Sequence, residues 1–406
     1  MKNSILFLVF VSFFILSTGI TAQDKGIFKE TKNAFWDKVK KSTEEFKKKK
    51  EEEHKSFVVD LSGYALPKSV DEFTSYWHNE PISQANSNTC WSFSTTSFFE
   101  CEIFRLFGKK VQLSPMWTAY WEFVEKARGF VQHRGEWSFQ DGSESNAVSR
   151  IWEKYGVVPA DVYTGLLPGQ EFLNTSDMFD EMKGYLDFVK ENNMWNEEEV
   201  ITTIKSIMDH WIGTPPEKFT LDGKEFTPKE YLKNYLKLNL DDYAEVMSLV
   251  QQPYWEQVEY EVSDNWWHNK DYYNVPLDVF MEIIKKGIRN GHTICIGGDV
   301  SEPGKNPELD VFMVPSFDIP TEYIDENARQ FRFSNETSTD DHGVHMVGYL
   351  QKDGKDWYLI KDSESSSRNG NNVGYYFFSE DYVKLKMLGF TIHKEVLGDL
   401  LDKFKE

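Results

Sequence analysis

Cys90 stands where a polar loop meets an apolar helix, and this position activates a thiol. The segment from Gln84 to Thr89 is polar, whereas the stretch that ends at Phe107 carries apolar side chains at helical spacing. Unpaired backbone N–H groups in the first turn of a helix favour the thiolate, and Thr89 is placed to cap that turn. We therefore predict that Cys90 is a nucleophile. A buried, inert cysteine is the alternative if Cys90 is judged alone.

Gln84 strengthens the first interpretation. It lies six residues before Cys90, in the loop that leads into the helix. Its side-chain amide could supply one donor to an oxyanion, and the backbone N–H of Cys90 could supply the other.

His342 is the candidate base, because a thiolate nucleophile needs a base and the base needs a group that orients it. His342 opens a predicted strand and can face a cleft, whereas alternation sends His345 to the other face, where we expect a structural role. The turn Lys352-Asp353-Gly354-Lys355 predicts a hairpin to the next strand. That strand ends at Asp362, which would emerge beside His342 and orient its ring. A surface aspartate at a strand end is the alternative.

The secondary structure that must position these residues is predicted to change from helices to strands along the chain. A helix is predicted over 90–107 and another over 277–288, whereas residues 166–276 lack strand alternation and are expected to form a helical insertion. Short apolar or β-branched runs predict four strands, at 293–296, 344–350, 357–360 and 375–378.

Six segments follow from these patterns. They are a secretory signal peptide (1–22), a charged helical arm (23–57), a helical subdomain with the nucleophile (58–165), the helical insertion (166–276), a β subdomain with the base and its orienting residue (277–394), and a C-terminal tail (395–406). The signal peptide predicts a secreted or periplasmic protein. Its apolar core is too short for a membrane anchor, so no stable membrane insertion is expected.

The net charge of −21 excludes the common nucleic-acid-binding classes, which need a basic face. The chain has three cysteines, and Cys90 and Cys101 would lie roughly 16 Å apart on one helix, beyond the reach of a disulfide. The fold must therefore rely on packing, and at least one thiol is free. No Cys/His cluster has the spacing of metal ligands, so no cofactor is expected.

Together these residues resemble the papain superfamily of cysteine peptidases. Gln84, Cys90-Trp91, the run from Asp341-His342 to Tyr349, and Lys361-Asp362-Ser363 are similar to its oxyanion, nucleophile, base and orienting segments, in the same order. The resemblance implies an α+β, papain-like fold with an N-terminal helical subdomain, a C-terminal antiparallel β-barrel-like subdomain and a helical insertion between them.

Further motifs resemble the bleomycin hydrolase and aminopeptidase C branch, over about residues 56–394. They are Leu113-Ser114-Pro115, Tyr120-Trp121, Gln140-Asp141-Gly142-Ser143, Tyr155-Gly156-Val157-Val158-Pro159, Tyr273-Asn274-Val275-Pro276-Leu277-Asp278 and Gly297-Gly298-Asp299-Val300-Ser301. Cys90 and His342 are 252 residues apart, and this branch also carries a helical insertion there. The resemblance implies that Trp91, Asp141, Gly142 and Ser143 contact the substrate.

Two departures from this branch stand out. The family has Asn followed by Ser-Trp-Gly where this chain has Asp362-Ser363-Glu364; an aspartate should still orient His342 and should favour the imidazolium. In the branch the C-terminal carboxylate lies in the cleft and meets the substrate amine, within a homohexamer. Here the chain continues past Lys394 in what looks like a short amphipathic helix.

The sequence thus predicts a peptidase that forms a thioester with peptide or protein substrates, an aminopeptidase by resemblance and a homo-oligomer by resemblance. Its nucleophile is Cys90, its base His342, its orienting residue Asp362 and its oxyanion donor Gln84. Two other functions stay open. One is acyl transfer by a transglutaminase-like Cys-His-Asp set, and the other is an inactive binding protein with the papain fold.

Overall fold

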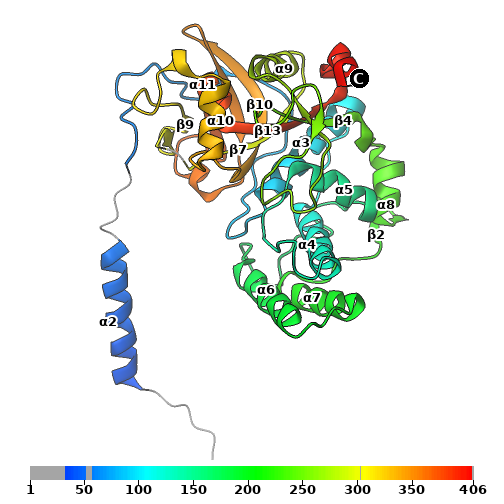
Figure 1. The fold of residues 1–406 in the computed structure, drawn as a ribbon. Coiled ribbons are helices and arrows are strands. Elements are labelled where there is room, and N and C mark those ends of the chain that lie inside the picture. The colour runs from blue at the N-terminus through cyan, green and yellow to red at the C-terminus, as the bar shows by residue number, and fades with distance from the viewer. Residues whose placement is uncertain (1–32, 52–56, 302, 405–406) are drawn as a thin grey trace, which may run out of the picture. The chain divides into compact units, whose positions relative to one another are not determined.

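The computed structural model describes residues 33–51, 57–301 and 303–404. The signal peptide predicted over 1–22 lies outside the described residues. Contacts divide the chain into two units after Phe57 (Figure 1), and each is described by itself. Among the described residues, no helix combines the length and the apolar character that crossing a bilayer requires.

The first unit contains one described helix, α2 (Ala34–Glu51), within the arm predicted over 23–57. Its aromatic side chains Phe35, Trp36 and Phe46 are exposed. An ion pair between Lys41 and Glu45, with 4.0 Å between nitrogen and oxygen, joins successive turns. Such an exposed pair contributes little to stability.

The second unit begins with helices that surround one buried helix, α3. The helices of this part are α3 (Cys90–Phe107), α4 (Pro115–Gln132), α5 (Ser145–Tyr155), α6 (Ser176–Glu191) and α7 (Glu197–Ile212). Helix α3 has the predicted bounds and ends at Gly108, whose φ of +65° is the left-handed conformation that closes many helices. Helix α3 packs against α4 and α5 on one side and against the sheet on the other (Figure 1).

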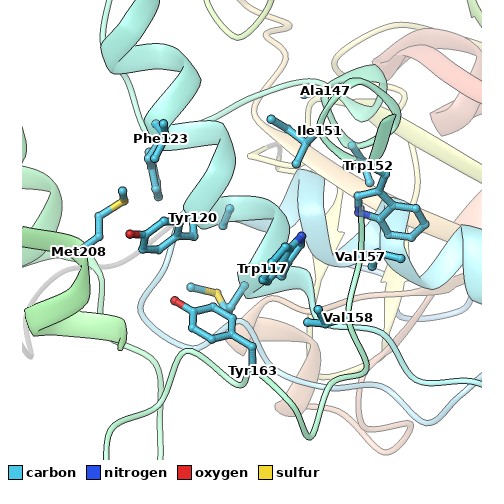
Figure 2. Packing of buried hydrophobic residues seen from close by; sticks show 14 of the residues in the cluster. Trp117, Tyr120, Phe123, Ala147, Ile151, Trp152, Val157, Val158, Tyr163 and Met208 are labelled. Carbon is cyan, nitrogen blue, oxygen red and sulfur yellow. The ribbon is translucent and has the colours of Figure 1, made fainter. Parts of the chain in front are cut away.

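The helical core is aromatic and its polar atoms are paired. Figure 2 shows part of this core, in which Trp117, Tyr120 and Phe123 come from α4, Trp152 from α5 and Met208 from α7. Tyr163, from the segment after α5, packs edge-on against Trp117 and Tyr120. The indole of Trp117 donates to the Gly156 carbonyl at 2.9 Å, and that of Trp152 donates to Thr118 Oγ1 at 2.8 Å. Large rings are thus buried without leaving their N–H groups unsatisfied, which would cost stability.

A mixed sheet forms the other half of the unit. Its strands pair in the order β5-β6-β4-β13-β7-β10-β11-β12-β9-β8, and β1 (Thr74–Ser75) adds to β10. The bounds are β4 Tyr243–Met247, β5 Gln257–Val258, β6 Tyr272–Asn274, β7 Ile294–Gly298, β8 Lys305–Asn306, β9 Val311–Phe312, β10 His342–Lys352, β11 Lys355–Lys361, β12 Tyr375–Ser379 and β13 Met387–His393. Helices α9 (Leu277–Arg289), α10 (Glu326–Ser334) and α11 (Glu380–Lys386) accompany it.

The antiparallel, barrel-like description of this subdomain holds only loosely. Among the described strands no pairing closes the sheet, and β4 with β6 and β12 with β9 run parallel. The predicted hairpin is present: β10 and β11 pair antiparallel, and the turn places Asp353 and Gly354 at φ of +51° and +78°. Positive φ at both central residues matches the twist of the strands.

The region predicted as a helical insertion, 166–276, is only partly helical. After α7 come a small hairpin of β2 (Phe219–Leu221) and β3 (Lys224–Phe226), then the short helix α8 (Pro228–Glu230). Strands β4, β5 and β6 then join the large sheet through β13. All five residues of β4 are buried, so the strand lacks the polar alternation that would have revealed it.

The C-terminal tail forms two short 3-10 helices, Lys394–Val396 and Gly398–Phe404, where we expected an amphipathic helix. Phe404 packs edge-on against Tyr273 of β6, with 4.8 Å between ring centroids, and also contacts Trp255. The tail is therefore docked onto the surface around β6.

Candidate active site

Cys90 is the first residue of α3, the helix that lies against β10. Thr89 occupies the N-cap position, but contrary to our expectation its side chain does not cap the helix; its hydroxyl bonds to that of Ser87, at 2.7 Å. The free N–H groups of the first turn are thus available to stabilise charge near the sulfur.

Cys90 differs from the other two cysteines in its exposure. All three are free thiols, but Cys101 and Cys295 are buried and Cys90 is partly exposed. Burial raises the pKa of the Cys101 thiol and raises that of Cys295 to about 12. These two thiols are therefore inert, and Cys90 is the accessible sulfur.

A close approach of α3 to β10 brings His342 to Cys90. Gly343 follows His342, and a Cβ atom at Gly343 would lie 3.0 Å from Ser94 Oγ and 3.4 Å from Trp91 Cα. The missing side chain lets the helix lie against the strand. His342, at the start of β10, then reaches the sulfur of Cys90, and the two side chains are hydrogen-bonded.

His342 is held between Asp362 and Cys90. Its Nε2 lies 2.8 Å from Asp362 Oδ1, so Nδ1 is the nitrogen that faces Cys90. Burial by itself would lower the pKa of His342, but the Asp362 carboxylate and the Cys90 sulfur raise it well above its ordinary value. The geometry therefore favours a thiolate–imidazolium pair.

Asp362 lies where the hairpin prediction placed it, one residue beyond β11. Its backbone N–H donates to the Gly374 carbonyl at 2.9 Å, and its Oδ1 also accepts from the backbone N–H of Glu364 at 3.1 Å. Burial would raise the pKa of Asp362, but His342 lowers it, so the carboxyl group is ionised. The surface-aspartate alternative is excluded because Asp362 is buried.

Gln84 is held in place by the residue after Asp362. Its Oε1 accepts from the Ser363 hydroxyl and its Nε2 donates to the Ser87 carbonyl, each at 2.6 Å. Its backbone N–H also donates to the Ser363 carbonyl at 2.9 Å. The amide retains one further N–H that can be offered to an oxyanion. The anchoring role of Ser363 was not predicted, although its place next to Asp362 was a signal.

The four residues expected to contact substrate divide into two groups. Trp91 and Ser143 line a pocket that also contains Cys90 and His342. Asp141 and Gly142 are outside this lining: Asp141 accepts a hydrogen bond from Asn88, and Gly142 lies against the carboxylate of Asp264. The Ser143 hydroxyl donates a hydrogen bond to Glu122 at 2.7 Å, which fixes the position of Ser143 in the pocket wall.

Glu364, which stands where the family has tryptophan, forms an ion pair with Lys305 at 2.8 Å. Arg368 donates to the backbone carbonyl of Glu364 at 2.6 Å and to that of Asp362 at 3.3 Å. Charged side chains therefore pack around the segment that carries Asp362.

One group of described residues, His342, Asp362 and Glu364, has the spacing of metal ligands. The imidazole nitrogens of this group already bond to Asp362 and Cys90, and Glu364 is paired with Lys305. The ligand atoms of these three residues are therefore already engaged in hydrogen bonds and an ion pair. His345 lies outside it, buried against α3 with its Nδ1 2.9 Å from Ser97 Oγ.

The pocket beside Cys90 contains residues that sequence reasoning missed. Its carboxyl groups come from Glu144, Glu245, Asp264, Asp340 and Asp341. The sequence could have indicated two of them, because Glu144 directly follows the predicted site residue Ser143 and Asp340 stands two residues before His342. Glu245 lies on β4, a strand that was not predicted.

Comparisons with known proteins show the family of this chain. The model of the peptidase C1-like family matches residues 30–406. Aminopeptidase C of Lactococcus lactis subsp. cremoris is 22% identical over 381 residues, which cover 82% of this chain and 84% of that protein. Aminopeptidase C of Listeria monocytogenes is 21% identical over 370 residues, which cover 80% and 82%.

A solved structure, that of PepW from Lactobacillus rhamnosis, matches with a TM-score of 0.63 at 18% identity and covers 92% of this chain and 94% of that one. At this level of identity the match bears on the fold, which is the α+β, papain-like fold expected from the sequence.

Proposed function

Because this chain belongs to the peptidase C1-like family and is a cysteine-type peptidase, we propose that it is an aminopeptidase that cleaves through a thioester on Cys90. One observation carries the proposal: the His342 ring is hydrogen-bonded to Cys90 on one side and to the buried Asp362 carboxylate, at 2.8 Å, on the other. This is the arrangement that a thiolate nucleophile requires.

The reaction follows from the geometry. The Cys90 thiolate attacks the scissile carbonyl carbon, and the new oxyanion accepts hydrogen bonds from the Gln84 amide and the Cys90 backbone N–H. His342 gives its proton to the leaving amine as the C–N bond breaks, which leaves a thioester. His342 then takes a proton from water, the hydroxide attacks the thioester, and the C–S bond breaks. One oxyanion donor contributes about 3 kcal/mol to such a step.

Preference for a free substrate amine is supported by the relatives named aminopeptidase C. The acidic pocket beside Cys90 agrees with this preference, because a carboxyl-lined pocket suits a cationic group. The other two functions are less well supported. An inactive binding protein has no physical need for a buried Asp-His pair aimed at a thiol, and acyl transfer has no specific support in the site.

The test compares a free-amine fluorogenic peptide with its N-acetylated counterpart on the purified protein. We expect cleavage of the free-amine substrate and loss of turnover by at least about a thousandfold in Cys90→Ala. Cys101→Ala is the matched control, because it removes a buried thiol away from the site. Cleavage of acetylated substrates alone would contradict the aminopeptidase assignment. No turnover and no alkylation of Cys90 by iodoacetamide would contradict the peptidase assignment.

Export and assembly are separate proposals. Residues 1–22 support a secreted or periplasmic location, which N-terminal sequencing of exported protein would check. Assembly into a homo-oligomer rests on the resemblance to the aminopeptidase C branch, and light scattering of the purified protein would check it.

A further inference from the structure

The pocket beside Cys90 lies between the helical half and the sheet. Glu144 reaches it from the residue before α5, Glu245 from β4, and Asp340 from the segment that leads to His342. Among the described residues that line this pocket there is no lysine or arginine. The cationic group in this wall is therefore His342, whose ring is already paired with Asp362 at 2.8 Å.

Glu144 and Asp340 form the centre of this cluster of carboxyl groups. Burial, and then the nearby Asp340, raise the pKa of Glu144 well above its ordinary value. Burial likewise raises the pKa of Asp340 to about 7, and the two side chains share a hydrogen bond. A buried carboxyl pair of this kind holds one proton between two groups and responds strongly to an incoming positive charge.

The neighbouring carboxylates are already engaged. Glu245 accepts hydrogen bonds from Thr391 at 2.7 Å and Ser145 at 2.8 Å. Asp341 accepts from the Val300 backbone N–H at 2.9 Å. Burial raises the pKa of Asp264, and the positive charge of the buried Lys126 opposes that rise. Glu144 and Asp340 are thus the pair left to meet a ligand.

Unsatisfied polar atoms point to a ligand independently of the charges. Within the described part of the chain, the hydroxyls of Tyr260 and Tyr272 are buried without a hydrogen-bond partner. Both tyrosines line the pocket and are no more than 2% exposed. Unpaired buried polar atoms cost about 1–3 kcal/mol each, so a group that pairs with them binds favourably.

We propose that Glu144 and Asp340 determine specificity by binding a cationic group of the substrate, with the Tyr260 and Tyr272 hydroxyls as further contacts. This inference rests on the proposed peptidase function. The cation is either the substrate's α-amino group or a lysine or arginine side chain next to the residue that supplies the scissile carbonyl.

The described part of the C-terminal tail, which ends at Phe404, does not line this pocket. Tyr272 lines the pocket, whereas its neighbour Tyr273 packs against Phe404. Successive side chains of a strand point to opposite faces, so Phe404 is on the face of β6 away from the pocket. Among the described residues, Glu144 and Asp340 are the side chains placed to bring negative charge to this cation.

The test measures kcat/KM ratios for two pairs of substrates. The first pair is alanyl-coumarylamide and its N-acetyl form, which reports on the α-amino group. The second pair is acetyl-lysyl-alanyl-coumarylamide and acetyl-norleucyl-alanyl-coumarylamide, which reports on a side-chain cation. We expect the charged member of one pair to be preferred by the unaltered protein. Glu144→Gln and Asp340→Asn should each reduce that preference by about ten- to a hundredfold.

Glu282→Gln, an exposed position on α9, is the matched control and should keep the preference. If neither pair shows a preference for the cation in the unaltered protein, the inference is wrong. It is also wrong if the ratio persists in both variants and in the double variant while Cys90 still reacts with iodoacetamide. Absence of that reaction in the unaltered protein would instead defeat the proposed function.

Discussion

The Ser363 hydroxyl donates a hydrogen bond of 2.6 Å to Oε1 of Gln84 and thereby fixes the orientation of the glutamine amide. The amide oxygen faces Ser363 and the amide nitrogen faces Ser87, whose carbonyl it meets at 2.6 Å. Since Ser363 directly follows Asp362, the same short segment orients both the base and the oxyanion donor.

We expect Ser363→Ala to lower kcat about tenfold with little change in KM, because the Gln84 amide loses its anchor and the donor matters most in the transition state. Gln84→Ala should lower kcat by about a hundred- to a thousandfold. Steady-state kinetics on one substrate measure both effects. If Ser363 acts through Gln84, the Ser363→Ala change should have almost no further effect in the Gln84→Ala background.

Replacement of Asp362 by asparagine should shift the alkaline limb of the kcat/KM profile to lower pH. The active form needs the His342 imidazolium, and the Asp362 carboxylate is the larger of the two contacts that raise the pKa of His342 against the effect of burial. With a neutral amide the imidazolium loses its proton at a lower pH. An Asp278→Asn control, exposed on α9, should leave the profile in place. An unchanged alkaline limb in Asp362→Asn would contradict the assignment.

Glu245→Gln should stabilise the protein at pH 8 but not at pH 4. Burial raises the pKa of Glu245 to about 7 from an ordinary value of 4.5. A carboxyl whose pKa is raised on folding contributes its full stability at pH values below its pKa in the unfolded state. This contribution to the free energy of unfolding is lost as the pH rises through its pKa in the folded state. Each pH unit between the unfolded and folded pKa values corresponds to about 1.4 kcal/mol, and glutamine does not ionise. Urea unfolding at the two pH values measures the difference. Equal effects at both would refute the prediction.

Gly298→Ala should lower the free energy of unfolding by about 2–3 kcal/mol, because the added methyl group meets backbone atoms that have little room to move. A Cβ at Gly298 would contact the Lys386 carbonyl and lie 2.7 Å from Met387 Cα. Gly389→Ala, on the neighbouring strand β13, is the control: its Cβ would meet only Val246 O, at 3.5 Å. Urea denaturation of the two variants should separate them clearly.

The parts of the site that the sequence predicted are those set by local rules. A polar loop followed by helical spacing placed Cys90 at the head of α3, and Gly108 ended that helix as expected. The turn at Asp353-Gly354 determined the pairing of β10 with β11, and this pairing carried Asp362 to His342. Helix periodicity, strand alternation and turn chemistry depend on neighbours within a few residues, so one sequence is enough to read them.

Tertiary structure alone decided the acidic pocket and the extent of the sheet. Glu144, Glu245 and Asp340 come from segments that are about a hundred residues apart, and they meet only because α3 docks on β10 and β4 pairs with β13. Strand β4 is buried on both faces and shows no alternation, so its sequence resembles that of a helix interior. Which elements pack together depends on the burial of whole faces across the chain, a property that no local pattern of residues contains.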